Sequence, residues 1–271
     1  MTATADTSGS NVAVAARVWN FLLGGKDNYE SDRIVARELL ALMPDADTTA
    51  LSGRAFLAKA IEYIVAAGVE QVVDLGFGLP MPPRLENTHD VARRINRSVR
   101  VIYLDTDPVV LAHGRALLHH PGGAIVDADI RDPKHVLDLL RGEQVDFTRP
   151  VGLVLTSVLH HLSDDEDPAA IVDVLRTALP AGSFLVMSHL CVETMQSYRA
   201  AAATALFSKL GAFHPRSLNQ ISNLFDGAEL VGPGVVEASA HWRPGERSQA
   251  DHPPKRGWQL IGGVARVPDH D

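Results

Sequence analysis

Residues 72–78 read Val-Val-Asp-Leu-Gly-Phe-Gly, and residues 101–107 read Val-Ile-Tyr-Leu-Asp-Thr-Asp. Each stretch has the apolar run of a buried β-strand and ends in a turn that carries an acid. In a parallel α/β sheet the C-terminal ends of neighbouring strands meet at one crevice, where nucleotides bind. The two glycines let backbone approach a ligand closely, and the Asp105 carboxylate can accept both hydroxyls of a ribose. The pair of stretches therefore predicts a site for an adenosine cofactor.

The glycine spacing bears on which adenosine cofactor this is. A dinucleotide site has a third glycine three residues after the second, but here that position is Met81, next to prolines that donate no amide hydrogen. The acid Asp105 also comes 27 residues after Gly78, later than the roughly 20 of a dinucleotide site. S-adenosylmethionine, which carries no phosphate, fits this turn better. An NAD-dependent oxidoreductase remains the less favoured alternative.

Composition limits the class of protein. The chain has 271 residues, of which 46% are hydrophobic, and 33 acidic against 25 basic residues give a formal charge of −8. No block of Lys and Arg is present to balance a phosphate backbone, so we expect no nucleic-acid partner. The single cysteine, Cys191, is consistent with a reducing compartment. No apolar stretch approaches the roughly 20 residues of a membrane span, which predicts a soluble, cytoplasmic protein without a membrane partner.

The order of predicted elements indicates an α/β fold. Residues 1–10 are expected to be a disordered leader, 11–68 a helical cap or lid, and 69–271 the cofactor-binding domain. Helical periodicity covers 12–23, 32–42 and about 50–66. Strands and helices then alternate, with strands expected at 71–75, 99–104, 123–127, 151–157 and 183–188. This alternation predicts a mostly parallel sheet with helices on both faces. Helices at 193–210 and 215–225 precede two strand-like runs, 229–240 and 257–267, expected to pair antiparallel at one edge of the sheet.

Three of the intervening helices have the same start signal. Asp107, Asp132 and Asp167 are each followed by proline. An aspartate N-cap followed by proline at the first helical position is a strong start signal. We therefore expect Asp107 to cap a helix rather than to contact a ligand.

Several motifs of the chain resemble one bacterial family. The stretch Ala-Arg-Val-Trp-Asn-Phe-Leu-Leu-Gly-Gly-Lys-Asp-Asn-Tyr at 16–29 is similar to the N-terminal signature of proteins formerly filed under a domain of unknown function and now called S-adenosyl methyltransferases. Further matching motifs lie at 74–80, 87–92, 103–113, 127–133, 158–162 and 182–189. The resemblance implies a Rossmann-like class I methyltransferase sheet, mostly parallel with a C-terminal antiparallel strand, and S-adenosylmethionine as the cofactor. The stretch between Pro80 and Asn87 is longer and richer in proline than the usual family turn, which leaves the start of the next helix open.

The resemblance also implies roles for individual residues. Asp74 would steady the cofactor's ammonium group through water, Asp105 would hold the ribose hydroxyls, and Asp129 would accept from the adenine amino group. Both acids also have an interpretation that involves no ligand: Asp105 would form a turn, and Asp129 would be an ordinary acid of a loop. The complete set of predicted cofactor-binding residues is Arg17, Asn28, Asp74, Gly76, Gly78, Asp105, Thr106, Asp129, Ile130 and Ser157.

The segment 16–29 has two interpretations. As local structure it is a short amphipathic helix that ends at Gly24-Gly25. The polar residues that follow exceed what a helix end requires, so we favour a lid over the cofactor, with Arg17 or Asn28 reaching the ligand.

His160 and His161 follow the fourth predicted strand, where class I enzymes place groups that face the transferred methyl. Either could accept a proton from an attacking hydroxyl or amine, with helix-end packing as the alternative, and His160 is preferred. The strand ends Thr156-Ser157-Val158, not in the Asn/Asp-Pro-Pro-Tyr of enzymes that methylate base or glutamine amines. We therefore expect a small-molecule acceptor. We also expect no metal, because the adjacent histidines lack the i, i+4 spacing of helical metal ligands. A non-catalytic S-adenosylmethionine-binding regulator remains an open alternative, and the oligomeric state is not determined by the sequence.

Overall fold

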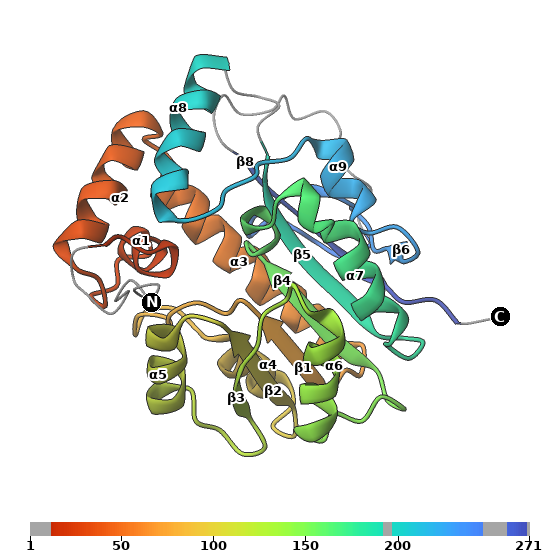
Figure 1. The fold of residues 1–271 in the computed structure, drawn as a ribbon. Helices are drawn as coiled ribbons and strands as arrows, with labels where there is room; N and C mark the ends of the chain where they lie inside the picture. The colour runs from red at the N-terminus through yellow and green to blue at the C-terminus, as the bar shows by residue number, and fades with distance from the viewer. Residues whose placement is uncertain (1–11, 192–196, 246–258, 270–271) are drawn as a thin grey trace, which may run out of the picture.

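The computed structural model describes residues 12–191, 197–245 and 259–269. Its centre is a mixed sheet in the order β3-β2-β1-β4-β5-β8-β6, with β7 paired to β8 (Figure 1). Strands β1 to β5 are parallel, whereas β8 is antiparallel to its neighbours. The strands are β1 (Gln71–Leu75), β2 (Arg100–Asp105), β3 (Ala124–Asp127), β4 (Val151–Thr156), β5 (Phe184–Cys191), β6 (Glu229–Leu230), β7 (Val236–Glu237) and β8 (Gln259–Arg266). The expected class I methyltransferase architecture is confirmed.

The helices begin where the capping signals predict. The side chains of Asp107, Asp132 and Asp167 accept backbone N–H groups at the start of α5, α6 and α7, and each has proline next to it. The start of α4, left open by the sequence, is set by a capping box between Asn87 and Asp90. The helices are α1 (Ala15–Leu22), α2 (Glu30–Leu42), α3 (Ala46–Ala66), α4 (Thr88–Ile95), α5 (Pro108–Leu117), α6 (Pro133–Gly142), α7 (Pro168–Thr177), α8 (Ser197–Phe207) and α9 (Leu218–Asn223), with 3-10 turns η1 (Leu159–His161), η2 (Asp164–Glu166) and η3 (Ser208–Leu210).

Alternate side chains of the parallel strands pack into two separate hydrophobic cores, one on each face of the sheet. Val72 and Val154 pack with α1 to α5 on one face, whereas Val73 and Leu153 pack with α6 and α7 on the other. Both faces of the strands are buried, as in parallel sheets covered by helices. The helices of the predicted cap, α1 to α3, share the first of these cores with the sheet. The division into 11–68 and 69–271 thus remains a prediction, and the expected leader 1–10 lies outside the described residues.

The C-terminal strands differ from the expectation in detail. The run 229–240 contains only the short strands β6 and β7, because Pro233 donates no hydrogen bond and Gly234 turns the chain at φ +88°. Strand β8 lies between β5 and β6. The last two strand regions are therefore antiparallel neighbours, but the strand later in the sequence occupies the inner position. Within the described residues no helix is long and apolar enough to cross a membrane.

Candidate cofactor and acceptor site

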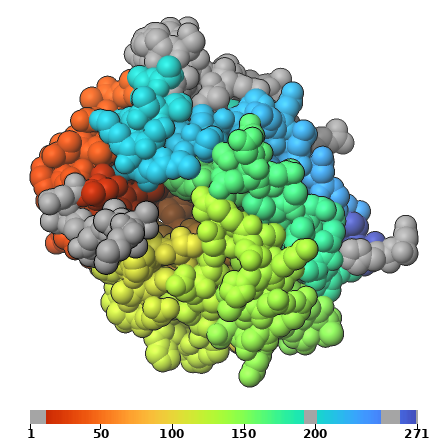
Figure 2. All heavy atoms as spheres, in the orientation of Figure 1, coloured from red at the N-terminus to blue at the C-terminus, as the bar shows by residue number. Residues whose placement is uncertain are grey.

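The C-terminal ends of β1 to β4 open into a cavity of about 370 Å³. This volume falls within the range of small-molecule sites, roughly 300–1,000 Å³. Figure 2 shows the surface hollowed between the orange-red N-terminal helices and the yellow-green elements that follow β1 to β4. Three parts of the chain line the cavity: the sheet edge, the helices α1 and α3, and the segment 210–212. The chain reverses its direction across the sheet between β1 and β4, which is where ligands bind in open α/β sheets.

The glycine turn after β1 forms part of the cavity wall. Gly76 and Gly78 adopt φ values of +71° and +67°, where glycine is favoured. A Cβ on Gly76 would lie 2.6 Å from a methyl of Val158, whereas a Cβ on Gly78 would meet no atom within 4 Å. Gly76 is therefore required by packing as well as by conformation. The space beside Gly78 is open to a ligand. The glycine turn therefore fits a cofactor that lies directly against the backbone.

Asp105 lies at the end of β2 with its carboxylate held by backbone. It accepts hydrogen bonds from the amides of Gly78 (3.2 Å), Thr106 (2.8 Å) and Asp107 (3.0 Å). Burial raises the pKa of Asp105, and these three backbone bonds oppose the rise. A carboxylate has about four acceptor positions, so capacity for a ligand hydroxyl remains. Asp105 and Thr106 both line the cavity.

The loop after β3 supplies another acid to the cavity wall. Asp129 and Ile130 line the cavity. The Asp129 carboxylate accepts from the Arg131 amide at 2.9 Å and from the Arg131 guanidinium at 3.3 Å. Arg131 also forms an ion pair with Glu166. The contacts with Arg131 thus stabilise the turn that carries Asp129 at the cavity wall.

Asp74 lies beneath the glycine turn and is absent from the cavity lining. Its side chain accepts a hydrogen bond of 2.6 Å from the Thr88 hydroxyl, and the residue is 2% exposed. Burial raises the pKa of Asp74 to about 6, against the opposing effects of Thr88 and of Arg54. Its placement supports a role as a counter-charge behind the cavity rather than direct ligand contact.

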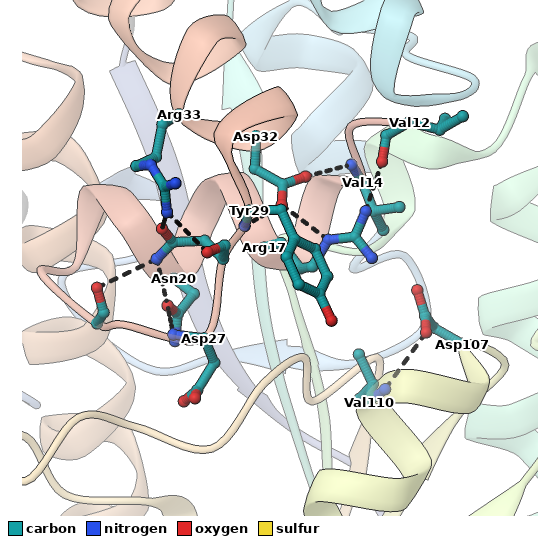
Figure 3. Close-up of polar contacts among 12 residues, drawn as sticks. Val12, Val14, Arg17, Asn20, Asp27, Tyr29, Asp32, Arg33, Asp107 and Val110 are labelled. Carbon is teal, nitrogen blue, oxygen red and sulfur yellow. Dashed lines mark hydrogen bonds and ion pairs between the residues drawn. The ribbon is translucent and has the colours of Figure 1, made fainter. Parts of the chain in front are cut away.

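The structure uses Arg17 and Asn28 differently from the expectation. The Arg17 guanidinium forms a buried ion pair of 2.8 Å with Asp32 (Figure 3). The Asn28 amide donates to the Asn20 side chain at 3.0 Å, and its oxygen accepts from Arg33 at 3.1 Å. Neither side chain lines the cavity, because these partners hold both of them within the N-terminal segment.

Other residues of this segment do form the cavity wall. They are Val14, Ala15, Ala16, Trp19, Asn20 and Leu23. Gly24 ends α1 with φ +75°, as expected for a helix stop. The Arg84 guanidinium donates to the Leu23 carbonyl at 2.7 Å and ties the loop after β1 to this helix end. These residues line the cavity together with the sheet edge, and a role of the segment as a lid remains a prediction.

Ser157 and His161 line the cavity at the end of β4, but His160 does not. Ser157 has the left-handed φ of 59°, a strained conformation for a residue other than glycine, and such strain gathers at functional sites. The Nδ1 atom of His161 lies 2.9 Å from the Ala212 carbonyl. His160 is 0% exposed, and neither of its ring nitrogens has a hydrogen-bond partner among the described residues. The structure thus favours the second histidine of the pair as the one that a ligand can reach.

Sequence reasoning missed Arg54 of α3, which lines the cavity. The signal was present in the periodicity, since Arg54 precedes Leu57 and Ile61 at spacings of three and seven on the apolar face of the helix. A charged residue on a buried helical face requires either a partner or a ligand. Trp19 of α1, which also lines the cavity, was included in the N-terminal signature but was not assigned to the site.

Known proteins are similar to this chain over nearly its whole length. A family profile described as S-adenosyl methyltransferase matches residues 1–268. A candidate methyltransferase from Thermobifida fusca YX, known from its crystal structure, is 36% identical with a TM-score of 0.85 over 95% of this chain and 96% of its own. A DUF574 family protein from Streptomyces avermitilis MA-4680 is 31% identical with the same TM-score, over 96% of this chain and 99% of its own. No curated protein matches the chain.

Proposed function

The chain belongs to the S-adenosyl methyltransferase family and is an S-adenosylmethionine-dependent methyltransferase, and we propose that its methyl acceptor is a small molecule. The observation that carries the proposal is the partial covering of the sheet edge by other elements. Helices α1 and α3 and the segment 210–212 all contribute to the wall opposite the strand ends. An acceptor must therefore enter a cavity lined by several elements. The formal charge of −8 also disfavours a nucleic-acid acceptor.

The wall residues divide into groups that suit parts of the cofactor. Asp105 with Thr106 would hold the ribose, and Asp129 with the Ile130 backbone would hold the adenine. Gly76, Gly78 and Ser157 would lie against the methionine portion. The bound cofactor supplies a methyl group that its sulfonium already activates. The task of the protein is then to orient an acceptor and to exclude water, and orientation alone can lower a barrier by roughly 7–11 kcal/mol.

His161 is the proposed base for an acceptor that must lose a proton. The Ala212 carbonyl can only accept, so the Nδ1 atom of His161 carries the hydrogen of that 2.9 Å contact. The Nε2 atom is therefore the unprotonated nitrogen of the neutral ring. Burial lowers the pKa of His161, which keeps the ring neutral near pH 7. A neutral imidazole that lines the cavity is suited to accept a proton there.

The acceptor class is tested by transfer from a radiolabelled methyl donor into a cell extract. The extract is separated by size into small molecules, proteins and nucleic acids, and calorimetry with S-adenosylhomocysteine verifies that the enzyme binds its cofactor. We expect label only in the small-molecule fraction. Label in protein or nucleic acid would overturn the proposed acceptor class.

The role of His161 is tested by comparing two neighbouring histidines. His161→Gln should lower the rate of methyl transfer by roughly 10²–10⁴-fold while cofactor affinity is retained. His160→Leu is the matched control, since the ring nitrogens of His160 have no partner to lose among the described residues. An unchanged rate in His161→Gln, or an equal loss in both variants, would remove His161 from the mechanism.

A further inference from the structure

Arg54 is a cation of the cavity wall that the groups assigned so far leave without a role. Its guanidinium makes no hydrogen bond or ion pair with any residue that the structure describes, and its Nε atom is buried without a partner. Arginine remains charged in proteins. The Nε atom of Arg54 is shielded from solvent, and burial lowers the pKa of the guanidinium. An arginine left in this state gains free energy when an anion enters beside it.

The nearest anionic group cannot satisfy Arg54. Asp74 acts on Arg54 through its charge, but the two side chains form no ion pair in the described structure. Asp74 already accepts the Thr88 hydroxyl at 2.6 Å, and its raised pKa of about 6 reflects the cost of its own charge. Asp74 thus reduces the cost of the buried cation from a distance. The guanidinium donors of Arg54 remain available to a ligand.

Among the described residues that line the cavity, Arg54 differs from the other arginine. Arg131 forms ion pairs with both Asp129 and Glu166, so its charge is already balanced by two carboxylates. His161 is neutral for the reasons given above. Arg54 is therefore the lining cation that is free to bind an anionic group.

The order of the sheet indicates which anionic group this is. The proposed adenine acid follows β3, the proposed ribose acid ends β2, and the glycine turn follows β1, and these three strands are consecutive neighbours. Arg54 lines the same cavity as Leu75 and Gly76 at the end of β1. A cofactor laid along this order brings its methionyl end toward α3. We propose that Arg54 binds the carboxylate of the methionyl portion of S-adenosylmethionine, an inference that rests on the proposed placement of the cofactor.

The test compares two ligands that differ at the group in question. S-adenosylmethionine carries the carboxylate, and its decarboxylated analogue keeps the adenosine, the sulfonium and the amine. Calorimetry on the wild-type chain should show the analogue binding about tenfold to a hundredfold more weakly, the range for a hydrogen-bonded charged group. Arg54→Met should weaken S-adenosylmethionine by a similar factor and should not weaken the analogue. The affinity of Arg54→Lys for S-adenosylmethionine should lie between those of the wild type and Arg54→Met, since lysine keeps the charge but loses the planar fork.

Lys59→Met is the matched control variant. It removes the same unit of charge from the same helix, at an exposed position that pairs with Glu62 and does not line the cavity. Its affinity for both ligands should equal that of the wild type. If Arg54→Met does not fold, the ligand comparison on the wild type and Arg54→Lys still decides.

The outcomes separate this inference from the proposed cofactor site. Equal affinity of the wild type for both ligands, or an equal loss of both in Arg54→Met, would overturn the role of Arg54 alone. A wild-type chain that binds neither ligand would overturn the cofactor site together with this inference.

Discussion

The two walls of the cavity hold their polar groups in different ways. On the sheet side, Asp105 is held by backbone amides within and beside its own turn. On the helical side, Arg17 is held by Asp32, which lies fifteen residues away on the next helix. Arg54, on the same side of the cavity, has no such partner among the described residues. A charged side chain near a ligand site is therefore free to bind the ligand only when the fold has not already paired it.

The largest expected effect separates Arg17, which lies behind the helical wall, from Arg54, which lines the cavity. Arg17→Met should lower the free energy of unfolding by about 3–5 kcal/mol, because it leaves the buried Asp32 without its counter-charge. Cofactor affinity of the folded variant should change little, since Arg17 does not line the cavity. Urea denaturation and calorimetry measure the two quantities.

Arg37→Met is the control for Arg17→Met. Arg37 pairs with Glu30 at the exposed surface, where solvent screens the two charges, so Arg37→Met should unfold at nearly the same urea concentration as the wild type. A loss of affinity without a loss of stability in Arg17→Met would break the contrast between Arg17 and Arg54.

The two glycines of the sheet wall should respond differently to alanine. Gly76→Ala should cost about 1–2 kcal/mol for the left-handed backbone and roughly a further 1–3 kcal/mol for the clash with Val158. Gly78→Ala should lower the free energy of unfolding only by the cost of the left-handed backbone, because its Cβ meets no atom within 4 Å. That Cβ would instead fill ligand space and weaken cofactor binding. Equal stabilities of the two variants in urea would contradict the packing at Gly76.

A smaller effect is expected from the pH dependence of Asp74. Burial raises its pKa from 3.8 to about 6, so the folded chain binds more protons than the unfolded chain between these values. The stabilising contribution of this group is therefore present at acidic pH and is lost as the pH rises through 6. Between pH 5 and 7.5 the loss should be about 1 kcal/mol.

Asp74→Asn isolates this contribution, because the amide does not titrate. The free energy of unfolding of the variant, relative to the wild type, should rise by that amount over the same pH range. Urea titrations at several pH values measure it. A constant difference between the two chains would mean that the carboxyl is not perturbed.

The sheet wall was largely predictable because backbone geometry determines it. Apolar runs located β1 to β5 within a few residues, and parallel strands deliver their ends to one edge. The positions of Gly78, Asp105 and Asp129 in the cavity wall follow directly from that rule. The Asp-Pro starts of α5, α6 and α7 were equally local, since each cap lies within three residues of the amides that it accepts.

The helical wall could not be predicted in the same way. Nothing local in the segment 16–29 shows that Arg17 would pair with Asp32 or that Asn28 would be held by Asn20 and Arg33. These partnerships depend on how α1 and α2 pack. The choice between His160 and His161 likewise depended on the direction of a 3-10 turn and on a carbonyl about fifty residues later, that of Ala212.

One consequence follows from the span of chain that lines the cavity. Val14 near the beginning of the described chain and Leu260 in β8 both contribute to its wall. Strand β8 pairs with β5, so a chain shortened before residue 259 lacks both this part of the cavity wall and the outer partner of β5. Such a chain would expose the unpaired edge of β5, and an exposed strand edge is a template for aggregation.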